Sequence, residues 1–126
     1  MEDRFLFRGK RIDNGEWVQG VPSYGEDGKI EEIEVWDGED ITFYSVFPGT
    51  ICQCTGLKDK NGNLIWENDI VKINNSKVNT LITFRDFEII CTIPNEKYYK
   101  HRLEYDTEYE VIGNIFDNPE LLESEG

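Results

Sequence analysis

Residues 53–71 read QCTGLKDKNGNLIWENDIV, and this stretch decides the fold class of the chain. Asn61 and Gly62 stand between two apolar patches, and an Asn-Gly pair in that setting is the strongest short-range signal for a β-hairpin. We therefore predict a tight turn at this pair, with a positive φ at Gly62. Leu57 and Ile65 are then expected to pack on the core side of the hairpin.

Most other apolar runs in the chain alternate with polar residues, which is the pattern of half-buried strands. About nine such runs, separated by short turns, predict an all-β protein that is mainly antiparallel. The sequence has no strand–helix–strand alternation, so a parallel nucleotide-binding sheet is not expected. The segments predicted as strands are residues 4–8, 16–21, 29–36, 41–47, 50–55, 69–74, 78–85, 87–93 and 109–116.

Three further segments bear on the organisation of the chain. Pro48-Gly49 interrupts the apolar pattern and sets a soft lobe boundary near residues 48–50, inside a single domain of residues 1–126. Residues 95–105 fit a helix, a polar edge strand or a long loop about equally well. Residues 119–123 predict one helical turn.

The charge of the chain narrows the choice of partners. Its 126 residues include 26 acidic and 13 basic side chains, which give a formal charge of −13. Such a chain repels nucleic-acid phosphates and anionic membrane surfaces, so neither is an expected partner. No segment approaches the ~20 apolar residues of a membrane span, and the acidic N-terminus is unlike a signal peptide. We therefore expect a cytoplasmic protein.

Three blocks of the sequence resemble the YopX family of phage and prophage proteins. They are residues 7–20, 53–71 and 109–122, and the central block is the most specific. Cys52 and Asn68 stand where the family often has Gly, and Asn tolerates the left-handed conformation that a Gly would supply. The residues of the central block that match the family pattern are Gln53, Thr55, Gly56, Leu57, Asp59, Gly62, Ile65, Trp66, Glu67, Asp69, Ile70 and Val71.

The resemblance has implications for fold and origin. It implies an all-β domain with a small SH3-like barrel in the C-terminal half, next to an additional N-terminal β lobe. It also implies a phage or prophage origin. It implies no activity, and no catalytic residue or cofactor is carried over from the family.

The residues best suited to metal or acid–base chemistry lack the spacing that such chemistry needs. Structural zinc usually draws on two paired ligand spacings, and one pair is missing here, so we expect no metal and three buried thiols. Glu67 and Asp69 are the only carboxylate pair in the central block, and no base or nucleophile accompanies them. We expect Asp69 to bond backbone N–H groups at a turn. The residues considered for zinc are Cys52, Cys54, Cys91 and His101.

Residues 97–102 form the only basic patch with interleaved aromatic side chains. Neighbouring acidic residues weaken this patch as a nucleic-acid site, so we interpret it as a surface for protein contact or self-association. The surplus of aromatic residues and the need to cover strand edges also predict a homo-oligomer. The candidate contact residues are Lys97, Tyr98, Tyr99 and Arg102.

These observations predict a phage or prophage accessory protein that works as a non-enzymatic protein-binding module. Two alternatives stay open. One is an acidic decoy that occupies the nucleic-acid-binding surface of a host protein, which a contiguous acidic face would favour. The other is an enzyme with a carboxylate-based site, which a cleft of converging carboxylates with perturbed pKa values would favour.

Overall fold

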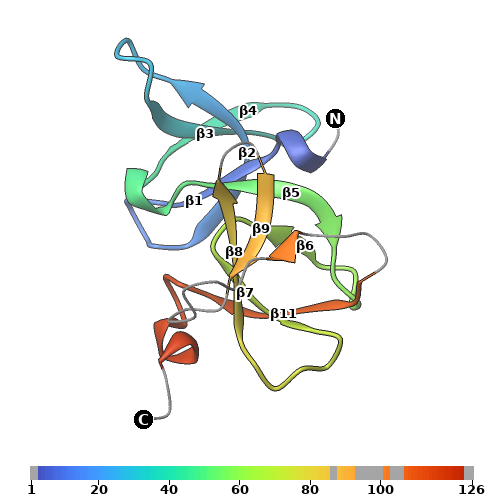
Figure 1. Ribbon diagram of the computed structural model, residues 1–126. Helices are drawn as coiled ribbons and strands as arrows, with labels where there is room; N and C mark the ends of the chain where they lie inside the picture. The colour runs from blue at the N-terminus through green and yellow to red at the C-terminus, as the bar shows by residue number, and fades with distance from the viewer. Residues whose placement is uncertain (1–2, 86–87, 93–100, 103–106, 124–126) are drawn as a thin grey trace. The chain divides into compact units, whose positions relative to one another are not determined.

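The computed structural model shows an all-β protein with antiparallel strands, as the sequence predicted (Figure 1). It describes residues 3–85, 88–92, 101–102 and 107–123. Within these residues no helix has the length and apolar character needed to cross a membrane. The described helical segments are the 3-10 turns η1 (Asp3–Phe5), η2 (Pro48–Thr50) and η3 (Pro119–Leu122), and η3 confirms the helical turn expected there.

The described strands form two sheets. The first has the order β4-β3-β2-β1-β5-β6, and the second has the order β10-β9-β8-β7-β11. Over the described residues neither sheet closes into a barrel, so the SH3-like barrel predicted for the C-terminal half is not confirmed. The first-sheet strands are β1 (Phe7–Lys10), β2 (Trp17–Tyr24), β3 (Ile30–Trp36), β4 (Ile41–Ser45), β5 (Cys52–Lys58) and β6 (Leu64–Trp66). The second-sheet strands are β7 (Asp69–Ile73), β8 (Thr80–Arg85), β9 (Glu88–Thr92), β10 (His101–Arg102) and β11 (Tyr109–Asn114).

Each predicted strand has an observed counterpart, although the ends differ. The first strand begins at Phe7 and not at residue 4, because the residues before it form η1. This turn is closed by the N–H of Leu6, which donates to the carbonyl of Asp3 at 3.0 Å. Of residues 95–105, which the sequence left open, only the two-residue strand β10 lies among the described residues.

The chain divides into two compact units, Met1–Cys54 and Thr55–Gly126, and strand β5 runs from the first into the second. The boundary expected near residues 48–50 falls at η2, shortly before this division. Unit 1 contains β1 to β4, and unit 2 contains β6 to β11.

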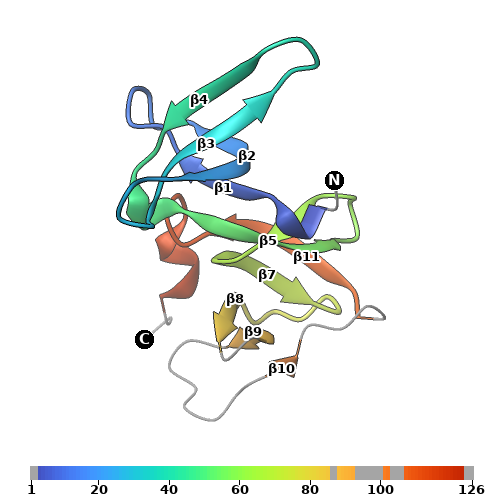
Figure 2. The ribbon, with the colours of Figure 1, turned by 90° about the horizontal axis from the view of Figure 1, so that it is seen from above.

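Unit 1 is a series of antiparallel strands in which β1 to β4 each pair with the next (Figure 2). Gly20 allows the closest approach between β2 and β3, because a Cβ at this position would lie 2.1 Å from the carbonyl oxygen of Glu34. No side chain fits at this point. The buried apolar residues of unit 1 are Ile33, Val46, Cys52 and Cys54.

Unit 2 has a core to which five strands each contribute one buried residue. Leu57 packs against this core, and Ile65 belongs to it, so both core positions predicted for the hairpin are confirmed. Strand β11 pairs with β7 through a register shift between Val111 and Gly113. The buried core residues are Ile65, Val71, Ile82, Cys91 and Tyr109.

Candidate interaction site

Asp59, in the central block of the sequence, bonds three backbone N–H groups. Its Oδ1 accepts from Asn61 at 3.0 Å and from Asn63 at 2.9 Å, and its Oδ2 accepts from Val111 at 2.9 Å. Burial alone raises the pKa of Asp59, but the N–H donors of Val111, Asn63 and Asn61 outweigh it, so the pKa lies below its usual range. Asp59 therefore fastens the hairpin turn to β11 and is not a free acid.

The turn after Asp59 is a three-residue loop. The N–H of Gly62 donates to the carbonyl of Asp59 at 3.0 Å, and the N–H of Asp59 donates to the carbonyl of Asn63 at 2.8 Å. Gly62 has a φ of 84°, which confirms the predicted positive value. This is the arrangement of a type I turn followed by a left-handed residue, one of the common ways to close a hairpin.

A second turn in the block, between β6 and β7, depends on Asp69. This side chain is 2% exposed, and its Oδ2 accepts from the N–H of Trp66 at 2.8 Å, as the sequence predicted. Asn68 has a φ of 71°, so it takes the left-handed conformation in place of Gly. Thr55 closes the hairpin from the other side, because its hydroxyl donates to the carbonyl of Ile65 at 2.8 Å.

The other residues of the block also have structural positions. Gly56 has a φ of 83°, and Gln53 and Glu67 are partly buried. The matching apolar residues in β6 and β7 are buried, namely Ile65, Trp66, Ile70 and Val71. The block that carries the family resemblance therefore builds a hairpin and a turn, and it presents no open constellation of polar groups.

The three cysteines are buried and form no disulfide with one another. Burial raises the pKa of the Cys91 thiol to about 12, so this thiol stays protonated and unreactive at neutral pH. The side chain of His101 lies outside the described residues. Among the side chains that the structure describes, no group of three or more His, Cys, Asp or Glu is placed to hold a metal ion.

The basic aromatic patch predicted at residues 97–102 falls outside the described part of the chain. This applies to Lys97, Tyr98 and Tyr99 as whole residues, whereas Arg102 is described only as backbone in β10. The patch therefore remains a prediction.

The hairpin of β3 and β4 in unit 1 exposes apolar side chains that the sequence analysis did not single out. Its turn is held by Asp37, whose Oδ1 accepts from the N–H of Glu39 at 2.9 Å and of Asp40 at 2.8 Å. These bonds, of which that of Asp40 is the stronger, lower the pKa of Asp37. Unlike Asp59, Asp37 is exposed, and these bonds stay within its own turn.

The register of this hairpin sorts its side chains onto two faces. Trp36 pairs with Ile41, and Glu34 pairs with Phe43, so these four side chains share one face. Ile33, on the opposite face, is 0% exposed. The first face is open instead: Trp36 is 71% exposed, Ile41 is 54% and Phe43 is 51%. We call Trp36, Ile41 and Phe43 the outer apolar face.

The backbone of β4 has one bonded edge and one open edge. At one end of the hairpin the N–H of Val46 donates to the carbonyl of Glu31 at 3.3 Å, and at the other end the N–H of Asp37 donates to Asp40 at 3.2 Å. Bonded and non-bonded pairs alternate along an antiparallel ladder. The even-numbered residues of β4 therefore bond to β3, and the odd-numbered residues direct their N–H and C=O groups away from it.

The outward groups of β4 are only partly used. The carbonyl of Ser45 accepts from the N–H of Ile12 at 3.0 Å, which covers one end of the edge. Ile41 and Phe43 direct their N–H and C=O groups outward over the rest of the edge. In the sheet order of the described strands β4 is terminal, as Figure 2 shows for β1 to β4. We call this stretch the open edge of β4.

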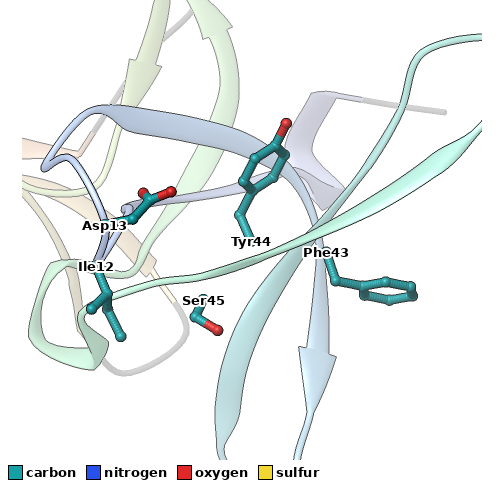
Figure 3. Close-up of a pocket in the computed structure, with 5 residues that line it drawn as sticks. All are labelled: Ile12, Asp13, Phe43, Tyr44 and Ser45. Atoms are coloured by element: carbon teal, nitrogen blue, oxygen red, sulfur yellow. The ribbon is translucent and has the colours of Figure 1, made fainter.

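A pocket of about 280 Å³ lies where Ile12 meets this edge (Figure 3). Figure 3 shows Asp13 and Tyr44 on one side of β4, and Ile12 and Ser45 on the other. Phe43 completes the lining, so the pocket combines apolar surface with two hydroxyl groups and one carboxylate.

The carboxylate of the pocket is oriented by an arginine. Arg11 donates to Asp13 through two nitrogens, at 3.0 Å and 2.6 Å, and its guanidinium lies 4.5 Å from the ring centre of Tyr44. The hydrogen bond with Arg11 lowers the pKa of Asp13, and the same bond raises the pKa of Arg11. Both groups are therefore charged at neutral pH, which makes Asp13 a fixed acceptor and a poor proton donor.

A signal for the outer apolar face was present in the sequence. Trp36 is two residues after Glu34 and four after Glu32, so the alternation of side chains along a strand places it on the same polar face. An aromatic residue at such a position is a candidate for contact with a partner. The pocket had no such signal in the sequence, because its lining comes from residues 12–13 and 43–45, which are far apart in the chain.

The fold and the candidate site together define a class: a small all-β protein with two open antiparallel sheets and an exposed edge strand. The YopX protein family matches residues 6–123, so the chain belongs to this family, as its sequence blocks suggested. The crystal structure of protein EF1440 from Enterococcus faecalis is similar, with a TM-score of 0.59 and 26% identity, over 93% of this chain and 96% of that one. No curated protein sequence matches the chain.

Proposed function

We propose that this chain is a non-enzymatic protein-binding module of phage or prophage origin, and that the outer apolar face of the β3–β4 hairpin contacts the partner. The observation that carries the proposal is the exposure of Trp36, Ile41 and Phe43 on one face of two paired strands. Full burial of an Ile or Phe side chain contributes about 1.5–3 kcal/mol, against which the costs of association count. Contiguous apolar surface of this kind marks interaction sites.

The two alternatives have weaker support. An acidic decoy needs a contiguous acidic face, whereas the carboxylates of this hairpin are interleaved with the outer apolar face. A carboxylate enzyme needs a titratable acid in a cleft, whereas the one carboxylate of the pocket is ion-paired with Arg11. Both observations favour the protein-binding module over these two alternatives.

The experiment compares two variants that differ in where they remove aromatic surface. The test variant is Trp36→Ser combined with Phe43→Ser. The control is Tyr24→Ser, because Tyr24 is 62% exposed and pairs with Ile30, at the opposite end of β3 from Trp36. A partner is first captured from bacterial lysate by crosslinking to the wild-type chain, then purified, and its affinity for each variant is measured by calorimetry.

The test variant is expected to bind the partner at least about 10-fold more weakly, because aromatic contacts at the centre of an interface each contribute more than ~1 kcal/mol. The control is expected to bind like the wild type. Equal affinities of the test and control variants would show that the outer apolar face is not the contact surface.

A further inference from the structure

We propose that the open edge of β4 binds an extended peptide segment of a partner protein as an added strand, and that the segment has basic residues at its ends. This rests on the proposed function and specifies its partner. Strand addition is a common mode of recognition, in which backbone hydrogen bonds provide affinity and pockets for alternate side chains provide specificity.

The backbone of β4 supplies the first requirement. Ile41 and Phe43 direct their N–H and C=O groups away from β3, in the spacing that an added strand uses. The N–H of Ser45 points the same way, while its carbonyl is bonded to Ile12. Because Ile12 already occupies the edge at Ser45, the added strand pairs with Ile41 to Phe43, which takes about three residues or roughly 10 Å of extended chain.

The side chains beside the edge supply the second requirement. A peptide residue on the outer face of the added strand lies next to Phe43 and Ile41, both of which are exposed. The pocket at the Ile12 end is positioned to receive a side chain of the added strand. Apolar residues at alternate positions of the peptide therefore complete the outer apolar face.

An open edge can pair with a second copy of this chain or with a segment of another protein, and charge distinguishes the two. From Ile30 to Ser45 the sequence has six acidic residues and no Lys, Arg or His. These residues include Glu32, which pairs with Ser45 at one end of the hairpin, and the acidic residues of the turn 37–40 at the other end. A second copy of this chain would bring two acidic hairpins together, and like charges across paired strands are destabilising. A basic segment gains attraction at both ends instead.

Amide hydrogen exchange measured residue by residue tests the mode of binding. The probe is the synthetic peptide acetyl-Lys-Val-Thr-Val-Thr-Val-Lys-amide, and its matched control has Glu in place of both Lys. At a tenfold excess over its Kd, the Lys peptide is expected to slow exchange at Ile41 and Phe43 about 10-fold. Thr42 and Tyr44 already bond to β3, so their exchange is expected to change little. The Glu peptide is expected to give no protection.

Each other outcome overturns the proposal in a distinguishable way. Binding of the Lys peptide that shifts the Trp36 resonances without slowing Ile41 and Phe43 would exclude strand addition, while leaving the outer apolar face as a contact surface. Absence of binding at millimolar peptide, or equal protection by the Glu peptide, would exclude a basic extended partner. A mass by light scattering of twice 14.7 kDa, with Ile41 and Phe43 protected before peptide is added, would assign the edge to a second copy.

Discussion

Two hairpins in this protein use the same local chemistry and have opposite surroundings. In each, an aspartate at the turn accepts backbone N–H bonds that hold the turn closed: Asp37 between β3 and β4, and Asp59 before β6. Asp59 makes one more bond, to Val111, a residue 52 positions away. The turn chemistry is therefore local in unit 1 and part of the tertiary structure in unit 2.

The side chains on the strands follow the same division. Trp66 in β6 is 4% exposed, and Trp36 in β3 is 71% exposed. The difference shows that the family-like block is used to build the fold, whereas the β3–β4 hairpin keeps apolar surface available. The most recognisable block of the sequence therefore has a structural position, and the exposed apolar residues of the β3–β4 hairpin lie outside it.

The largest expected effect separates the two tryptophans. Trp66→Ala should reduce the free energy of unfolding by about 3–5 kcal/mol, because it removes a large buried side chain. Trp36→Ala should change it by less than ~0.5 kcal/mol, because an exposed side chain loses few contacts. Urea unfolding followed by circular dichroism measures both. A loss above ~2 kcal/mol for Trp36→Ala would show that the outer apolar face is needed for folding.

The next effect separates the two aspartates. Asp59→Ala removes the acceptor of three backbone N–H groups in a buried position, and we expect it to cost about 2–4 kcal/mol of unfolding free energy. Asp37→Ala should leave the unfolding midpoint nearly unchanged, because water replaces the exposed acceptor. Equal losses for the two variants would contradict the distinction between a local and a tertiary turn.

A smaller effect tests the turn at Gly62. Its φ of 84° is unfavourable for a β-branched residue, so Gly62→Val should destabilise the protein by about 1–3 kcal/mol. No atom lies within 4 Å of a Cβ built at this position, so the cost comes from the backbone and not from a clash. Gly62→Asn is the matched control, since Asn tolerates this conformation. Thermal unfolding by calorimetry distinguishes them, and equal melting midpoints would remove the argument.

The sequence predicted what depends on near neighbours. The positive φ of Gly62, the core positions of Leu57 and Ile65, and the bonding of Asp69 to a turn N–H all follow from residues a few positions apart. The left-handed Asn68 belongs to the same group. Local propensity and tertiary structure agree at these positions, which makes a short motif sufficient.

What the sequence did not predict depends on distant neighbours. The bond from Val111 to Asp59 and the bond from Ile12 to Ser45 join segments that are far apart in the chain, and neither leaves a pattern in one dimension. The pocket beside Ile12 is lined by both residues of the second bond. The closed barrel expected for the C-terminal half would likewise depend on pairing between strands that are far apart in the sequence.

The last prediction concerns acid stability and returns to the two aspartates. The pKa of Asp59 in the folded protein lies below its value in the unfolded chain, which is about 3.9. The unfolded state therefore binds a proton first as the pH falls. The contribution of Asp59 is complete above about pH 4 and is lost as the pH falls through the folded pKa.

The unfolding free energies of the wild-type chain and of Asp59→Asn should accordingly differ most near neutral pH and become equal in acid. The difference in unfolding free energy is measured from urea midpoints at several values between about pH 7 and pH 3. It should be smaller than the loss expected for Asp59→Ala, because Asn keeps the size of the side chain and one oxygen. The pKa of Asp37 is also lowered, yet its carboxylate is exposed, so Asp37→Asn should follow the wild-type curve at every pH. Parallel curves for Asp59→Asn and the wild type would mean that the charge of Asp59 is unimportant and that only its shape and hydrogen-bonding oxygen hold the turn to β11.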